Sequence, residues 1–547
     1  MSPAVRRGLL GAAAMIAVIT VISRLLGLVR WLAQASALGA SGIGDAYTGA
    51  NIIPNVLFET AAGGALAGAL IPVLAGPIAR RAADQTRAII AGALGWTLLV
   101  LVPLGVLLAL LADPVALALN VGDQLRATTR FFVLVFSVQI PLYGLTVLAY
   151  AVLQAHRRFF WPAFAPILSS LVTIGALVWY GRMAESATCL STMPVGALEV
   201  LAWGTTAGVV AMCLPALVVM ARAGWLPAPR LRFPDGVAPR VRSLALAGVA
   251  GVAAQQVSVL VLNLVAGYST VGTRIVLQWT QAIYLLPYAV LVVPLVTATF
   301  PRLSEWAARE RQDRFAALSA TTTRAVVVVA GMGAAVLAAA APAVAAVFAL
   351  LDRQQSALVS ESMTGALTWM VPGLLGFAVM FHGQRTLYAL ERGRLALVAG
   401  ALGWGVVSLA AVGGFFVVGQ GGPVLEVLAA AVTLGMTVGG LVTVALVVRA
   451  AGRAALAGLA RTAGVVVIAG TLGAVAGRWV VDSVIVLIGH GMWQSLGAGA
   501  GAGLVAVVMI GCVLYLGDRA VVRDVAGLAR RSRTTRPAED PKRDDLG

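Results

Sequence analysis

The sequence contains few charged residues, three cysteines and three histidines. Asp, Glu, Lys and Arg make up 11% of the 547 residues, whereas charged residues make up about 25% of an ordinary soluble domain. Such scattered cysteines and histidines form neither a disulfide framework nor a metal site. No Walker loop, HExxH pair or nucleophile elbow in a suitable context is present. These absences exclude a secreted enzyme and a cytosolic nucleotide-binding protein, and we expect no catalytic residue, metal or cofactor.

Long apolar runs dominate the sequence instead. Hydrophobic residues make up 60% of the chain, and each bilayer crossing needs about 20 of them. The first run contains Arg24 and Arg30, so it is interpreted as a retained helix and not as a cleavable signal peptide. The sequence predicts an all-α polytopic membrane protein with about 14 transmembrane helices. The predicted spans lie near residues 8–34, 46–79, 88–112, 128–154, 160–181, 197–221, 243–267, 274–300, 325–351, 363–390, 395–419, 424–448, 462–487 and 493–516.

Basic residues outnumber acidic residues by 39 to 22, which gives a net charge of +17. When the segments between the spans are assigned alternately to two sides, 30 of the 39 basic residues fall on the side of the N-terminus or at the helix ends there. Lys and Arg collect on the cytoplasmic side of membrane proteins. The excess charge therefore indicates orientation and not nucleic-acid binding, and both termini are predicted to be cytoplasmic.

Two sequence matches indicate an internal repeat. Ala69–Leu74 in the second span resembles Ala298–Leu303 in the eighth, and Tyr150–Gln154 resembles Tyr388–Glu391 at nearly the same offset. Six spans is an even number, so two six-helix repeats would run parallel. We expect a six-helix N-terminal lobe, a six-helix C-terminal lobe, two additional helices and a basic, disordered cytoplasmic tail. Their predicted bounds are 1–225, 226–455, 456–516 and 517–547.

Two arginines in the first span are candidate site residues, because a charge inside the membrane costs from about 2.5 kcal/mol upward and generally faces a cavity or a partner. Arg24 and Arg30 are six residues apart, which separates them by about 9 Å along a helix and about 120° around it. That offset suits two sides of one cavity, and the planar donors of arginine suit phosphate oxygens. The alternative for Arg30 is that it snorkels to the outer membrane interface.

Polar residues also interrupt the second span. Asn51, Asn55 and Glu59 are spaced by four residues and so share one helix face. Glu59 is the expected partner of Arg24 or Arg30, because an unpaired charge there would be costly. The alternative is that this segment, with its glycines, serves helix packing alone.

The eighth and tenth spans supply further polar groups. Arg274, Gln278 and Gln281 share a face of the eighth span, and Arg385 lies one turn before Tyr388 in the tenth. A second cavity wall and a set of interhelical contacts are equally good interpretations of the first three residues. Arg385 either faces the cavity or snorkels to the cytoplasmic surface.

Four stretches of the sequence resemble the MurJ (MviN) family of lipid II flippases, in the multidrug/oligosaccharidyl-lipid/polysaccharide exporter superfamily. They are Ser23–Arg30, Asp45–Leu74 with Ile53-Pro54-Asn55, Val152–Pro166, and Leu286-Pro287 with Phe300–Ser304. The resemblance implies a bacterial cytoplasmic-membrane protein with a cationic central cavity. The cavity would receive the pyrophosphate of the lipid-linked peptidoglycan precursor and release it outside by alternating access. Arg24, Arg30 and Asp45 match positions that are important in the family.

The sequence departs from the family pattern at two places. Phe58 and Glu59 stand where many members have paired arginines, and Ala282 stands where the family has an arginine before the Leu-Pro of the eighth helix. Cavity cations are thus missing at both places, with Arg274 as a candidate substitute. We expect Arg24, Arg30, Asp45, Asn55, Glu59, Arg274, Gln281 and Arg385 to contact the substrate.

Three functions fit these observations. The first is translocation of lipid II, an undecaprenyl-pyrophosphate-linked precursor, from the inner to the outer leaflet. The second is export of another polyprenyl-linked glycan or an amphipathic molecule, because one fold serves many substrates. The third is a membrane scaffold without transport activity, bound to cell-wall synthesis proteins, which the missing cations and basic tail would suit.

Overall fold

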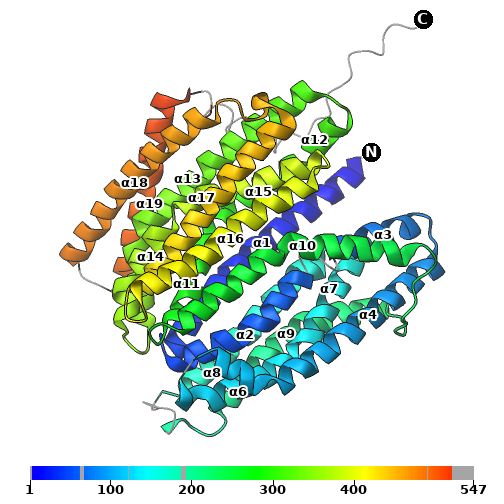
Figure 1. The fold of residues 1–547 in the computed structure, drawn as a ribbon, viewed down its shortest axis with the longest axis horizontal. Helices are drawn as coiled ribbons and strands as arrows, with labels where there is room; N and C mark the ends of the chain where they lie inside the picture. The colour runs from blue at the N-terminus through cyan, green and yellow to red at the C-terminus, as the bar shows by residue number, and fades with distance from the viewer. Residues whose placement is uncertain are drawn as a thin grey trace, which may run out of the picture.

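The computed structural model describes residues 3–61, 67–120, 122–185, 192–488, 491–519 and 521. These residues form helices and connections, with no strand in the described part (Figure 1). The first half contains α1 (Pro3–Leu38), α2 (Gly42–Thr60), α3 (Ala67–Ala79), α4 (Ala83–Leu110), α5 (Ala112–Ala118), α6 (Asp123–Ser137), α7 (Gln139–Ala155), α8 (Phe160–Met183) and α9 (Ala197–Arg222).

The second half continues with helices of similar length. They are α10 (Val237–Gly267), α11 (Thr273–Pro287), the π-helical turn η3 (Tyr288–Val292), α12 (Val293–Ala308), α13 (Gln312–Leu351), the π-helical turn η4 (Leu358–Ser362), α14 (Met363–Met370), α15 (Gly373–Ala389), α16 (Gly393–Val418), α17 (Val424–Ala451), the short 3₁₀ turn η5 (Arg453–Leu456), α18 (Leu459–Ile488) and α19 (Met492–Gly517). Every predicted span coincides with one helix or with two consecutive helices, which confirms the predicted fold class.

Proline accounts for two of the helix breaks. In the described residues, twelve helical segments are long and apolar enough to cross a membrane, and a bent pair makes a thirteenth. That pair, α14 and α15, meets at an angle of 43° beside Pro372, because proline removes a backbone donor and clashes with the preceding turn. Pro287 ends α11 at the η3 turn. The predicted second span corresponds to α2 and the short apolar α3, and residues 62–66 between them lie outside the described part.

The last two helices pack on one side of the second half (Figure 1). Small residues of α13, α18 and α19 form one apolar cluster, including Ala339, Ala469 and Ala502. Small side chains let helix backbones approach closely inside a membrane. The predicted six-helix repeats and the lobe bounds stay predictions. The predicted tail from residue 522 onward, Cys189 and His490 lie outside the described residues.

The helices share one core at one end of the bundle and divide into separate clusters toward the other. The shared cluster joins the C-terminal end of α1, at Leu38, to α13 and α17, at Phe348 and Leu428. At the opposite end one cluster joins the first half, at Leu70 and Leu153, to the start of α10, and another lies within the second half, at Leu303 and Phe315. We call the end with the shared core the closed end and the opposite end the open end.

Side-chain exposure along the central helices agrees with this division. On α1 the residues from Val18 to Val29 are mostly exposed, whereas Ala35 and Leu38 are buried. Similarly, α10 is exposed at Leu246 and buried at Ala266. In Figure 1, α1 lies between the two groups of helices, and its N-terminus is at the same end of the bundle as α12. The open end is therefore the end that carries most of the arginines in the connections.

Candidate functional site

Arg24 lies on the part of α1 that the neighbouring helices leave exposed at the open end. Glu59, near the end of α2, is also exposed, and Arg24 is the basic residue whose charge acts on its carboxylate. No ion pair joins the two side chains within 4.0 Å in the described part of the chain. The structure thus brings Arg24 and Glu59 into one electrostatic neighbourhood and leaves both free to meet a ligand.

Arg30, further along α1, faces a polar pocket of about 80 Å³ that is lined by helices of the first half and by Gln278 of α11. Its guanidinium lies over the ring of Trp31, 5.0 Å from the centroid, an arrangement that stabilises a cation beside an aromatic face. The pocket is lined by Arg30, Trp31, Gln34, Tyr47, Asn51, Asn55, Tyr143, Ser169, Thr173, Leu177, Thr205, Val209 and Gln278. Arg30 is therefore placed against polar protein groups and not at the outer surface.

Asn55 and Asn51 supply amide groups to the same pocket from α2. The Asn55 Oδ1 accepts a hydrogen bond of 3.2 Å from the hydroxyl of Tyr143 on α7. The Asn51 Oδ1 is buried without a hydrogen-bond partner in the described residues. Burying a polar atom without a hydrogen-bond partner costs free energy. The Asn51 Oδ1 is therefore available to accept a hydrogen bond from water or a ligand group.

The sequence analysis did not name Tyr47 and Thr205 as candidate site residues, although it included Gln278 as a candidate for a cavity wall. Tyr47 forms a 3.0 Å hydrogen bond with Thr205 on α9, and Thr48 donates to Gln278 on α11 at 3.3 Å. A tyrosine within an apolar run indicates a polar contact between helices, because a buried hydroxyl usually has a hydrogen-bond partner. The sequence did not show which helices would supply that partner.

Asp45, in the first turn of α2, caps α11 instead of facing the pocket. Its carboxylate is buried and accepts hydrogen bonds from the backbone N–H of Gly272 at 2.7 Å and of Ile275 at 3.0 Å. These are the free donors at the start of α11, where a negative charge is favoured by the helix dipole. Asp45 therefore joins α2 to α11 at the closed end.

Arg274 is fully buried at the closed end and makes contacts with backbone carbonyls. Its Nε donates to the carbonyl of Asn263 and its Nη1 to the carbonyl of Asp45, both at 3.1 Å, and its Nη2 donates to Leu119. A side chain on Gly267 would overlap this guanidinium. Arg274 ties α10, α2 and α5 together, so we do not include it or Asp45 among the residues proposed to contact substrate.

The other two predicted residues lie on α11 and α15, in the second half of the chain. Gln281 on α11 is half-buried and forms no hydrogen bond in the described part of the chain. Arg385 on α15 is half-buried, with its guanidinium 5.9 Å from the ring centroid of Phe300 on α12. Neither residue lines the polar pocket.

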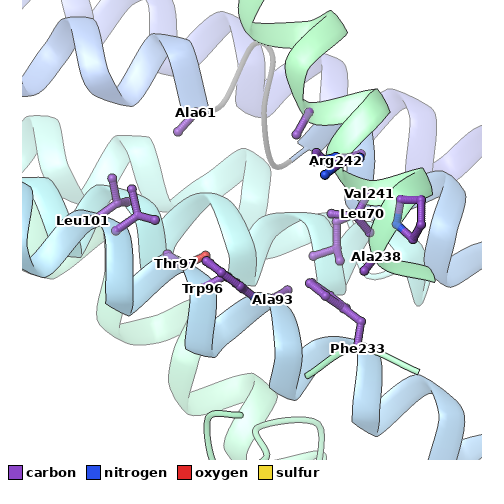
Figure 2. A pocket seen from close by; sticks show the side chains of 14 residues that line it. Ala61, Leu70, Ala93, Trp96, Thr97, Leu101, Phe233, Ala238, Val241 and Arg242 are labelled. Carbon is purple, nitrogen blue, oxygen red and sulfur yellow. The ribbon is translucent and has the colours of Figure 1, made fainter. Parts of the chain in front are cut away.

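A larger pocket lies between α3, α4 and α10, and its chemistry is different (Figure 2). It measures about 580 Å³ and is lined mainly by apolar side chains, including Leu70, Trp96 and Phe233. Arg242 is the charged residue in its wall. An apolar wall suits hydrocarbon better than a pyrophosphate, so the pocket around Arg30 is the better candidate for polar recognition.

The described residues contain no group of three or more His, Cys, Asp or Glu side chains that could hold a metal ion. The chemistry available at the open end and in the polar pocket is cation and amide hydrogen bonding. These groups bind and orient anions. The arrangement fits a binding site in a membrane, formed mainly by α1 and α2.

Comparison with solved structures places this arrangement in a known fold. A structure described as lipid II flippase MurJ in an inward closed conformation superposes with a TM-score of 0.70 over 92% of this chain and 99% of that one, at 16% identity. An inward-facing multidrug resistance MATE family transporter of the MOP superfamily has a TM-score of 0.65 over 79% of this chain and 95% of that one, at 13% identity. At these identities the likeness shows the fold alone.

Curated relatives match part of the sequence. The probable lipid II flippase MurJ of Vibrio cholerae is 29% identical over 324 residues, 57% of this chain, and that of Burkholderia cenocepacia is 30% identical over 296 residues, 52% of this chain. The chain spans 60% and 55% of the length of these two relatives. A family model described as lipid II flippase MurJ matches residues 34–493, and the chain belongs to this family.

Proposed function

We propose that this protein is a flippase that moves lipid II, an undecaprenyl-pyrophosphate-linked peptidoglycan precursor, from the inner to the outer leaflet by alternating access. The observation that carries the proposal is the division of the packed core into separate clusters toward the arginine-rich end, where α1 exposes Arg24. Family membership and the MurJ-like fold support it. The open end then faces the cytoplasm, with both termini on that side of the bacterial inner membrane.

The pyrophosphate of the precursor binds first at Arg24 and then at Arg30. Arginine presents two parallel donors to phosphate oxygens, and a low-dielectric membrane interior strengthens that attraction relative to water. Arg30, with Asn51 and Asn55 beside it, receives the headgroup deeper in the protein. The polyprenyl tail remains in the hydrocarbon core of the bilayer, because exposing its apolar surface to water would be unfavourable.

Glu59 favours a second candidate substrate, another polyprenyl-linked glycan or an amphipathic molecule. A carboxylate repels pyrophosphate unless Arg24 neutralises it, and the structure has no ion pair between them in the described part. A substrate with an amine or many hydroxyl groups would use that carboxylate as an acceptor. A scaffold that binds cell-wall synthesis proteins would need neither Arg24 nor Arg30. Substitutions of these arginines therefore also test the scaffold function.

The test is complementation in a host whose lipid II flippase is depleted. We expect this chain to restore growth and to make precursor accessible on the outer leaflet. Arg24→Ala should fail at equal membrane abundance, and Arg311→Ala, which removes an exposed cation from the connection before α13, should succeed. Growth without precursor at the outer leaflet would support another substrate, and growth supported equally by Arg24→Ala would support the scaffold.

A further inference from the structure

The connection after α13 crosses from the second half to the first at the closed end. Asp352 is 3% exposed, and its Oδ1 accepts a 2.8 Å hydrogen bond from the backbone N–H of Ala40, between α1 and α2. The same carboxylate accepts from the backbone N–H of Gln354 at 3.1 Å and of Ser356 at 2.8 Å. One carboxylate thus orders its own connection and holds the α1–α2 turn.

Arg353 makes the neighbouring contact with the first half. Its Nη1 donates to the carbonyl of Gly181 at 3.3 Å, and its Nη2 donates to the carbonyl of Ala184. These carbonyls belong to the last turn and the C-terminal end of α8, where free acceptors and the helix dipole favour a cation. Two adjacent residues of opposite charge therefore bind two different segments of the first half.

The turn that receives Asp352 is shaped for close approach. Gly39 has a φ of +64°, a conformation that glycine adopts without strain. A Cβ atom at this position would lie 2.6 Å from the Asp352 Oδ1 and 3.1 Å from the Gln354 backbone nitrogen. Any larger residue would push the connection away from the turn, so the contact depends on bare backbone at Gly39.

We propose that Asp352 and Arg353 form a clasp that holds the exit side of the transporter shut, and that the clasp opens when the substrate is released. The role of the clasp rests on the proposed flippase function, whereas its hydrogen bonds do not depend on that proposal. In the described residues, the hydrogen bonds of the clasp with the first half all join it to backbone atoms, so a rigid-body separation of the halves breaks them together. Charged groups released into water recover hydration, which keeps the open state accessible.

The experiment measures the distance between spin labels on either side of the clasp. Labels are placed at Arg182→Cys and Ser360→Cys, both exposed, in full-length protein without its three native cysteines, reconstituted in lipid nanodiscs. We expect one short-distance population in the parent. Asp352→Ala and Arg353→Ala should each raise a longer-distance population several-fold. Arg353→Lys should raise it less, because the positive charge stays although the planar donor pair is lost.

Two further variants separate the clasp from general loss of folding. Gly39→Ala keeps both charged side chains and should give the same longer distance through steric displacement. Glu361→Ala removes an exposed carboxylate nearby and should leave the distances unchanged. The proposal is overturned if folded Asp352→Ala and Arg353→Ala retain the parent distribution. That result would leave the flippase proposal standing, because complementation by the unlabelled parent tests it separately.

Discussion

At the scale of single residues, the same side-chain type performs three different tasks in this protein. Arg24 is exposed at the open end, Arg30 lines a polar pocket, and Arg274 is fully buried against carbonyl groups. The environment decides the task, because the guanidinium of Arg274 is buried and three of its five N–H groups donate to carbonyl groups of the protein. Substitutions of these three arginines should therefore impair the protein in different ways.

Arg24 should affect transport more than stability. Loss of a charge-assisted contact costs about 1.5–3 kcal/mol, which corresponds to roughly 10- to 150-fold weaker binding. Arg24→Lys should retain part of the function because the charge stays and the planar donor pair is lost. Precursor accessibility on the outer leaflet should then decrease from the parent to Arg24→Lys to Arg24→Ala. Equal activity of all three at equal abundance would refute the cationic route.

Glu59→Gln tests whether the carboxylate works together with Arg24. The change removes a charge while keeping the size of the side chain, so it should reduce transport more than expression. Complementation and membrane abundance, measured together, provide the comparison. Glu305→Gln, at an exposed carboxylate paired with Arg309 at 3.0 Å, is the control and should leave both unchanged. An unaffected Glu59→Gln protein would remove this residue from the site.

Arg274 should affect stability more than binding. Arg274→Met keeps much of the side-chain volume and removes three hydrogen bonds to carbonyls, each worth about 1.5–3 kcal/mol when the donor is charged. The purified protein in detergent should unfold at a clearly lower temperature. Arg24→Met should show little change in the same assay, because that side chain is exposed. Equal unfolding temperatures would contradict the structural role.

At the scale of helices, close packing of small residues holds α18 and α19 on α13. A Cβ on Gly477 would lie 2.7 Å from the Cβ of Ala339 and 2.7 Å from the carbonyl oxygen of Ala502. Gly477→Leu should therefore separate α18 from both neighbours and increase protease cleavage in the α17–α18 connection. Gly497→Ala, with nothing within 4 Å of its added Cβ, should behave like the parent. Unchanged cleavage in Gly477→Leu would show that this contact is dispensable.

At the scale of the whole molecule, orientation is tested by labelling from outside the cell. The connection before α13 is exposed and lies with the arginine-rich open end, whereas Val195, 98% exposed, lies in the connection between α8 and α9. Gln312→Cys should react with an impermeant maleimide after permeabilisation, and Val195→Cys should react in intact cells. The reverse pattern would overturn the predicted topology and place the open end outside.

The sequence by itself determined the helical fold, the positions of the spans and which residues are unusual in a membrane. These features are local, because about 20 apolar residues suffice to specify a crossing and each loop carries its own charge. Even the interrupted second span was visible in Asn51, Pro54 and Glu59. The helical period placed Asn51 and Asn55 on one face of the second span, and in the structure both line the pocket that contains Arg30.

Only the tertiary structure decided what each buried charge does. Asp45 accepts a hydrogen bond from Gly272, Arg274 donates one to Leu119, and Asp352 accepts one from Ala40. The two residues of each pair are far apart in the chain. An isolated charge in an apolar run indicates that a partner exists but not which one, because many distant backbone groups could satisfy it. Whether such a residue recognises a substrate, caps a helix or closes one end therefore depends on how the two halves pack.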